Sequence, residues 1–184
     1  SGIREVEIRF ERIKEKRLSS SADRIRKRAD YPYLFCQIRQ PSEDYLLLPQ
    51  HSSSDRRYIP IGFMPSDVIA GNACYIVQNA SLFLFGLLTS NVHMAWTRVV
   101  CGRLGEGYRY SPAIYNNFPF PSISPVQKAK IEQTAQGILD ARDLYPDSSL
   151  ADLYDPLTMP PELRKAHKAN DIAVMKAYGF STNM

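Results

Sequence analysis

The sequence predicts an α+β fold: a small, mostly antiparallel sheet with packed helices, followed by an α-helical C-terminal unit. Four short runs of aromatic and aliphatic residues, separated by Pro, Ser, Asp, Asn or Gly, indicate the strands. Segments with apolar residues at helical spacing lie before and after these runs. A proline-rich break at residues 119–125 precedes the tail, so we expect three parts: residues 1–30, 31–122 and 123–184.

Residues 1–30 form a charged arm that we expect to be helical. Apolar side chains recur at 3-4-3 spacing over residues 3–17, and Ser21 is placed to cap a short second helix through Arg28. The arm holds ten Lys/Arg and six Asp/Glu, so it accounts for the net charge of +4. Because charge runs are usually solvated faces, a connector from a missing upstream domain is favoured over an arm that lies on DNA phosphates. The chain begins with Ser-Gly instead of Met, and we expect it to be a segment of a longer polypeptide.

The strands are expected at residues 31–38, 44–49, 57–64 and 73–78. Two helices follow, at residues 82–88 and 92–100. The block TSN at residues 89–91 places hydroxyls and an amide at the start of the second helix. Such a block can hold a phosphate or can simply cap the helix, and the residues alone favour the cap.

Residues 123–184 are predicted to be a helical unit. Ser124 as N-cap and Pro125 at the first helical position predict a helix to about Leu144. A second helix is expected to start near Pro161 and to end before Gly179, since glycine favours the conformation that follows a helix C-terminus. By composition alone this unit is structural.

Composition excludes several classes of protein. No apolar run approaches the roughly 20 residues that a membrane-spanning helix needs, so no membrane partner is expected. The three cysteines are widely spaced without a CxxC pair, which favours a reducing, cytoplasmic environment and argues against a zinc site. The three histidines show no metal-ligand spacing, and each is expected to be a surface or packing residue. The sequence therefore predicts no metal site.

The residue patterns of known catalytic and cofactor loops are missing. Gly102, Gly105 and Gly107 form G-x-x-G-x-G, but this follows a helical pattern instead of a strand, so these glycines are predicted to be turn residues. Residues 116–120 (NNFPF) imitate the Asn-Pro-Pro-aromatic loop of amino-methylating enzymes but lack the adjacent prolines. The sequence shows no P-loop, HExxH motif or nucleophile elbow. This chain alone is predicted to have no catalytic residues and no cofactor-binding residues.

The basic side chains of residues 31–122 are six arginines, with no lysine. Lysine serves where phosphate neutralisation is the only task, whereas the planar arginine fork can bind guanine O6 and N7 together. Arg103 and Arg109 supply donors and Glu106 an acceptor on a glycine-rich turn, which suits the reading of base edges. A surface salt bridge between Glu106 and one of these arginines explains the same pattern equally well from the residues alone.

Residues 87–121 (LLTSNVHMAWTRVVCGRLGEGYRYSPAIYNNFPFP) resemble the target-recognition region of the MmeI-like (type IIL) restriction-modification enzymes and related adenine-specific DNA methyltransferases. Further matching pieces are residues 56–63 (RRYIPIGF), 153–163 (LYDPLTMPPEL) and 177–179 (AYG). The resemblance covers most of residues 31–180, while residues 1–30 match only in their charged, helical character. It implies a DNA target-recognition domain followed by the family's C-terminal helical domain.

The resemblance also implies partners and site residues. This chain would bind double-stranded DNA, and a methyltransferase domain upstream in the same polypeptide would hold S-adenosyl-L-methionine. Residues 104–107 would set the sequence specificity, although Gly-Glu-Gly stands where relatives often carry bulkier or charged residues. The residues expected to contact DNA are Arg56, Arg57, Ser90, Asn91, His93, Arg98, Arg103, Glu106, Arg109, Tyr110 and Ser111.

A second class of function stays open from the sequence: a non-catalytic protein-interaction module. In that case the apolar run at residues 82–88 and the tail helices would dock a partner protein. Salt-sensitive DNA binding would then be absent even from the intact protein.

Overall fold

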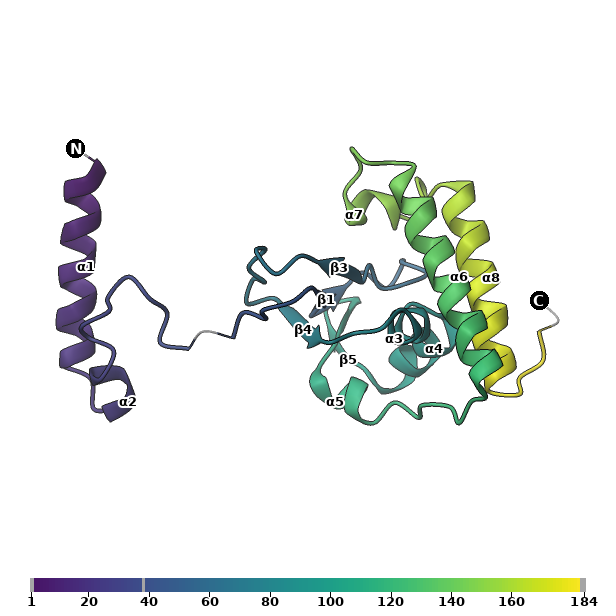
Figure 1. The fold of residues 1–184 in the computed structure, drawn as a ribbon, viewed down its shortest axis with the longest axis horizontal. Helices are drawn as coiled ribbons and strands as arrows, with labels where there is room; N and C mark the ends of the chain where they lie inside the picture. Colours follow the sequence, from purple (N-terminus) through teal and green to yellow (C-terminus); the bar gives the residue numbers. More distant parts are fainter. Residues whose placement is uncertain (1, 38, 183–184) are drawn as a thin grey trace. The chain divides into compact units, whose positions relative to one another are not determined.

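The computed structural model describes residues 2–37 and 39–182. The chain divides into two compact units, Ser1–Gln40 and Pro41–Met184, which are described separately below. The predicted α+β fold is confirmed, since helices accompany two small antiparallel sheets (Figure 1).

The first unit contains the helices predicted for the charged arm. Helix α1 spans Gly2–Leu18 and has no buried residue, and the short helix α2 spans Asp23–Arg26. The N-cap residue of α2 is Ala22, without a capping side chain, so the prediction that Ser21 caps a helix through Arg28 is wrong. The strand predicted at residues 31–38 is wrong for 31–37, which form turns and bends. Residue 38 lies outside the described part of the chain.

Arg17, near the end of α1, explains why the predicted strand does not form. Its guanidinium donates to the carbonyl oxygens of Arg28 (2.8 Å), Tyr31 (2.6 Å) and Leu34 (2.6 Å). These bonds engage carbonyl groups that a strand would offer to a neighbouring strand. The segment therefore folds back onto α1 and is held there by one arginine.

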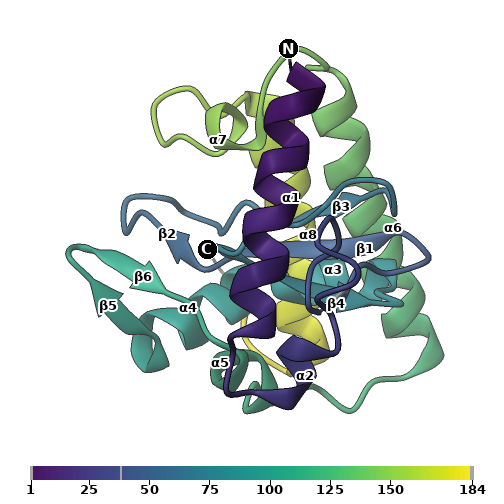
Figure 2. The same ribbon diagram turned by 90° about the vertical axis from the view of Figure 1, so that its left-hand side faces the viewer.

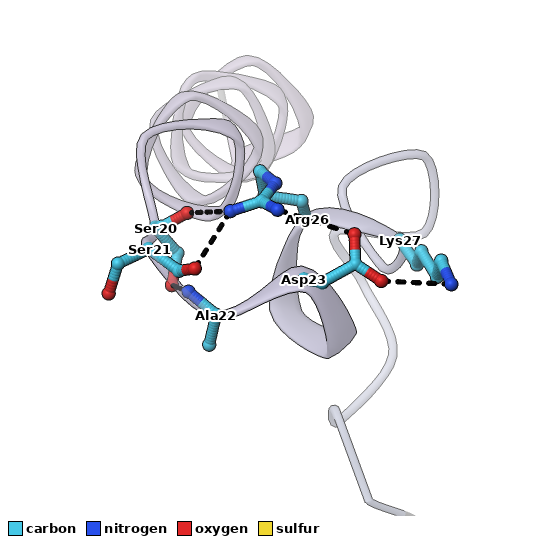
Figure 3. A network of polar contacts seen from close by, with 6 residues as sticks. All are labelled: Ser20, Ser21, Ala22, Asp23, Arg26 and Lys27. Atoms are coloured by element: carbon cyan, nitrogen blue, oxygen red, sulfur yellow. Dashed lines mark hydrogen bonds and ion pairs between the residues drawn. The ribbon is translucent and has the colours of Figure 1, made fainter.

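Arg26 fixes the connection between α1 and α2 (Figure 3). Its guanidinium donates to the carbonyl oxygens of Ser20 (2.8 Å) and Ser21 (2.9 Å) and pairs with Asp23 at 3.3 Å. Lys27 also pairs with Asp23, at 2.9 Å. Exposed ion pairs of this kind stabilise by less than about 1 kcal/mol, so these contacts shape the connection more than they stabilise it.

The first sheet of the second unit has the strand order β3-β1-β4, with bounds Gly62–Met64, Tyr45–Pro49 and Cys74–Gln78. Both neighbours run antiparallel to β1, so Leu46 pairs with Phe63 on one side and Val77 on the other. The strands predicted at residues 44–49 and 73–78 are confirmed.

The strand predicted at residues 57–64 is confirmed only at its end, where β3 forms. Tyr58, Ile59 and Ile61 are buried, but their backbone is irregular. The Ile61 N–H donates to the Ile59 carbonyl oxygen at 2.9 Å, which makes a three-residue turn around Pro60. These apolar residues resemble a strand in the sequence because their side chains are buried, although their backbone does not form one.

The second sheet has the order β2-β6-β5, with bounds His51–Ser52, Gly107–Arg109 and Gly102–Leu104. The sequence analysis did not predict these strands. Each has only two or three residues, which is too short for side-chain alternation to be detected.

The helices α3 (Leu82–Leu88) and α4 (Asn91–Val100) agree with the predicted helices. Ser81 caps α3 by accepting from the Leu84 N–H, and Ser90 caps α4 by accepting from the His93 N–H. The block at residues 89–91 thus acts as a helix cap, the interpretation that the residues alone favour.

The tail is dominated by two long helices, α6 (Pro125–Asp143) and α8 (Pro161–Ala177), with the short helices α5 (Pro112–Asn116) and α7 (Leu150–Leu153) before and between them. Ser124 caps α6 in a capping box with Gln127, as its position predicts. Figure 1 shows α6 and α8 side by side. Helix α3 packs against α6, so one apolar core joins the first sheet to the tail helices.

Within the described residues, no helix combines the length and the apolarity that a bilayer crossing requires.

Candidate nucleic-acid interface

The β5–β6 hairpin extends from the body of the second unit, with β2 beside it (Figure 2). Gly105 lies between the strands with φ of +58°, a left-handed conformation that glycine adopts without strain. A Cβ atom at Gly107 would lie 2.9 Å from the Ser52 carbonyl oxygen, so the absence of a side chain lets β2 approach β6. The predicted turn is confirmed at Gly105, whereas Gly102 and Gly107 lie in the strands.

The two faces of this sheet differ in exposure. Ser52, Tyr108 and Arg103 are paired across the three strands and share one face. Tyr108 and Ser52 are only 5% and 7% exposed, so this face lies against the core. The opposite, outer face carries His51, Gly102, Leu104, Gly107 and Arg109.

Arg103 braces the hairpin from the inner face. Its guanidinium carbon lies 4.3 Å from the centre of the Tyr108 ring, and the group donates to the Glu106 carbonyl oxygen at 3.2 Å. Such a cation–π contact contributes about 0.5–1 kcal/mol at an exposed site. Arg103 is therefore partly committed to the hairpin, although the residue stays exposed.

Arg109 and Glu106 are exposed polar groups of the hairpin. The ion pairs found among the described residues all lie elsewhere, at Asp23 and between Lys128 and Glu132. The salt bridge considered for Glu106 is therefore not formed in the described part of the chain. Arg109 belongs to strand β6 and Glu106 to the turn between β5 and β6, and both residues are exposed to an external ligand.

The remaining arginines predicted to contact DNA lie on other elements. Arg98 is exposed in the last turn of α4, two residues before its end. Arg57 is exposed and lies over the Tyr58 ring at 5.6 Å. Arg56 is half-buried and donates to the Ala151 carbonyl oxygen at 3.3 Å, so it links this loop to α7.

Three predicted contact residues are in the interior instead of on the surface: Ser90, His93 and Tyr110. The Ser90 hydroxyl donates to the Leu87 carbonyl oxygen at 2.7 Å. The His93 ring contacts the Leu88 carbonyl oxygen through Nδ1 (2.7 Å) and the Tyr110 hydroxyl through Nε2 (2.9 Å). Their polar atoms are satisfied internally, so these side chains support the chain that follows the hairpin and do not reach its surface.

Burial also sets the charge of this interior cluster. Desolvation lowers the pKa of His93 to about 4, because the buried ring has little water to stabilise its charged form. Desolvation likewise raises the pKa of the Tyr110 hydroxyl. At neutral pH the His93–Tyr110 pair is therefore an uncharged, buried hydrogen-bonded contact.

Asn91 is half-buried at the start of α4, where its backbone N–H donates to Asp171 at 2.8 Å. The carboxylate of Asp171 therefore lies at the helix N-terminus, the position that a DNA phosphate would need. Ser111 is half-buried at the N-terminus of α5, where its side chain makes no capping hydrogen bond.

Residues 116–120, which imitate a methylating loop, are part of an aromatic cluster. Phe118 is 4% exposed, and its ring meets those of His93, Trp96 and Phe120 edge to face. The Asn117 amide donates to the Ala113 carbonyl oxygen at 2.8 Å. The Phe118 ring also meets that of Tyr178, and the Tyr178 hydroxyl donates to the Pro119 carbonyl oxygen at 2.8 Å, so the segment packs α4 against the end of the tail.

The structure adds one exposed residue that the sequence analysis did not include, His51. It pairs directly with Arg109 across the β2–β6 ladder. In the sequence, His51 is followed by Ser52 in a strand of only two residues. That is too short for an alternating pattern to predict which of the two side chains is exposed.

Comparisons with known proteins agree on the family. The family model described as "MmeI, target recognition domain" matches residues 1–122, and the one described as "MmeI, C-terminal domain" matches residues 123–184. DNA methyltransferase A of Bacillus subtilis (strain 168) is 37% identical over 186 residues, covering 94% of this chain and 21% of the relative.

A solved structure gives the same result. The type IIL restriction-modification enzyme MmeI in complex with DNA is 48% identical with a TM-score of 0.86, over 96% of this chain and 24% of that one. The chain thus spans only about a fifth to a quarter of the length of these relatives. The matched parts contain both small sheets and the tail helices, and they show that the chain belongs to the MmeI family and carries its target recognition and C-terminal domains.

Proposed function

We propose that this chain selects the DNA sequence that an adenine-specific, S-adenosyl-L-methionine-dependent methyltransferase of a restriction-modification system modifies. The relatives are described as a DNA methyltransferase and as a restriction-modification enzyme in complex with DNA, which supports this assignment. The methyl transfer itself belongs to an upstream domain of the same polypeptide, acting on double-stranded DNA in the cytoplasm. The segments of this chain that resemble cofactor or catalytic loops form a hairpin and an aromatic cluster instead.

One observation carries the proposal: Arg109 stands on the exposed face of a small, well-paired sheet. A major groove about 12 Å wide admits a two-stranded ribbon, so the β5–β6 hairpin has a suitable size to enter it. Arginine on such a ribbon can bind O6 and N7 of one guanine together. The exposed carboxylate of Glu106 can accept from the amino group of cytosine, a contact that arginine cannot make.

Arg98 and Arg57 are assigned to the phosphate backbone in this proposal. Both are exposed, and both lie outside the hairpin, on α4 and on the loop before β3. Phosphate contacts orient a protein on the duplex without distinguishing sequences. Ser90, His93 and Tyr110 do not contact DNA in this proposal. From the interior they hold α4 and the chain after β6 in place.

The test uses the full-length enzyme and a set of duplexes in which each base pair of the recognised site is changed singly. We expect Arg109→Ala to lose discrimination at one base pair by about 1–3 kcal/mol, or roughly 5- to 150-fold in relative methylation rate. Arg98→Ala should instead weaken binding to every duplex alike and should reduce the slope of log K against log salt by about 1. An unchanged preference in the Arg109→Ala enzyme at every position would overturn the assignment.

The protein-interaction module receives less support from the structure. Its main element, the apolar run of α3, is largely internal, with Phe85, Gly86, Leu87 and Leu88 all buried. The remaining residues of the run, Leu82, Phe83 and Leu84, are half-buried, so this helix offers a partner only part of its apolar surface.

A further inference from the structure

We infer that His51 is a second specificity-determining residue, which contacts the base pair next to the one contacted by Arg109. This inference rests on the proposed function and adds a residue from a different segment of the chain. His51 belongs to β2, more than 50 positions before the hairpin, and reaches the hairpin only through strand pairing.

The pairing fixes the direction of the His51 side chain. His51, Arg109 and Gly102 form one rung across the three strands, and Ser52, Tyr108 and Arg103 form the next. Side chains of successive residues point to opposite faces of a sheet. Ser52 and Tyr108 face the core, so His51 and Arg109 face outward together.

The residue before His51, Gln50, is held by two backbone hydrogen bonds. The Gln50 carbonyl oxygen accepts from the Tyr110 N–H at 2.8 Å, and the Gln50 N–H donates to the Ala73 carbonyl oxygen at 2.9 Å. His51 therefore sits at the point where the chain passes from the first sheet to the second. A contact residue on paired strands is placed more accurately than one on a free loop, as sequence reading requires.

The outer face leaves room for DNA beside this pair. Gly102 completes the rung without a side chain, and a Cβ atom there would meet nothing within 4 Å. Gly107 also lacks a side chain, although a Cβ atom there would meet the Ser52 carbonyl oxygen, so Leu104 is the one further side chain of the paired residues on this face. The imidazole and the guanidinium can therefore approach a ligand without obstruction from their own sheet.

The spacing of the two side chains is compatible with contacts to successive base pairs. Neighbouring strands lie about 4.8 Å apart, and successive base pairs about 3.4 Å along one DNA strand. Two side chains on one rung therefore reach adjacent base pairs more readily than the same one. Imidazole offers a donor or an acceptor nitrogen to a base edge, which complements the donor-only guanidinium.

The experiment compares three variants of the full-length enzyme, His51→Ala, His51→Gln and Arg109→Ala, on duplexes changed singly at each base pair of the site. Gln78→Ala, an exposed polar residue of β4 on the other sheet, is the matched control. We expect His51→Ala to lose roughly 5- to 150-fold of discrimination at a base pair adjacent to the one affected by Arg109→Ala. His51→Gln should change the preferred base there, since an amide also donates and accepts but with different geometry.

The outcomes separate this inference from the proposed function. If Arg109→Ala relaxes one position and both His51 variants keep the original preference, the inference about His51 is wrong and the proposed function stands. A uniform loss of affinity in His51→Ala, with a salt slope reduced by about 1, would assign His51 to a phosphate and also overturn it. If neither residue affects any position, the proposed function fails as well.

Discussion

Tyr58 and Asp171 lie 113 positions apart in the chain, and the Tyr58 hydroxyl donates a 2.7 Å hydrogen bond to the Asp171 carboxylate in the interior. The other oxygen of Asp171 accepts from the Asn91 N–H at the start of α4. One side chain of α8 thus holds both the loop before β3 and the helix that leads to the hairpin. The tail is therefore a structural support for the loop before β3 and for α4.

The same loop is held by a second set of buried polar contacts. The Tyr58 ring stacks on His167 with centroids 4.1 Å apart, and His167 Nε2 lies 2.6 Å from the Tyr154 hydroxyl. Arg142 of α6 contacts that hydroxyl and donates to the Ile61 carbonyl oxygen at 2.9 Å. These contacts cross residue 122, where the two family models meet, so the two matched domains share one interior.

Removal of the Tyr58 hydroxyl tests the importance of this link. We expect Tyr58→Phe to lower the free energy of unfolding by about 1–3 kcal/mol, because the buried Asp171 carboxylate loses a donor and gains no water. Chemical denaturation of the 184-residue chain measures the change. Tyr145→Phe is the matched control, since it removes a 2.7 Å bond from Tyr145 to Glu162 at the surface and should change stability little. Equal effects of the two substitutions would contradict the role assigned to Tyr58.

Buried histidines make stability depend on pH. The pKa of His93 is lowered to about 4 by burial, whereas an unfolded histidine titrates near 6.5. Between these pH values His93 is protonated in the unfolded state but not in the folded state, so the free energy of unfolding decreases as the pH falls. Burial also lowers the pKa of His167, which acts in the same direction. The raised pKa of Asp171 opposes the trend, because its folded carboxyl group binds a proton at a higher pH than the unfolded one.

We expect the free energy of unfolding to decrease between pH 7 and pH 5, with about 2 kcal/mol of the loss coming from His93 alone. Urea denaturation at several pH values measures the slope. His93→Gln should be less stable at pH 7, where it loses ring contacts, but its stability should vary less with pH. A variant with the same slope as the original chain would show that His93 does not carry this dependence.

The sequence was sufficient to predict the helices and strands whose position depends on neighbouring residues. The serine caps and apolar spacing located α4 and α6 almost to the residue, because capping and amphipathicity are properties of neighbouring residues. The central strand β1 was also predictable, since Leu46 and Leu48 sit in a run that has no other use than burial.

The rest depends on contacts that are distant in the sequence. Residues 31–37 have strand-forming side chains, yet Arg17 engages their carbonyl groups. His93 is a polar residue that was predicted to contact DNA. In the structure it is buried, and its two ring nitrogens contact the Leu88 carbonyl oxygen and the Tyr110 hydroxyl. His51 joins the candidate interface only through its pairing with β6. The spacing of residues in the sequence does not identify these contact partners, so they are known only from the folded structure.

The packing of α3 against the tail gives a direct test of the shared interior. A Cβ atom at Gly86 would lie 2.7 Å from Ile131 Cγ2, 3.1 Å from the Ala135 Cβ and 3.1 Å from the Asn170 Oδ1. These are atoms of α6 and α8, so Gly86→Ala should force the helices apart and destabilise the chain by about 1–3 kcal/mol. Gly137→Ala, in the middle of α6 with nothing within 4 Å of its Cβ, should instead stabilise the chain by up to about 1 kcal/mol through helix propensity. Thermal unfolding of the two variants compares them directly, and a Gly86→Ala variant at least as stable as the original chain would show that α3 does not pack against the tail as tightly as described.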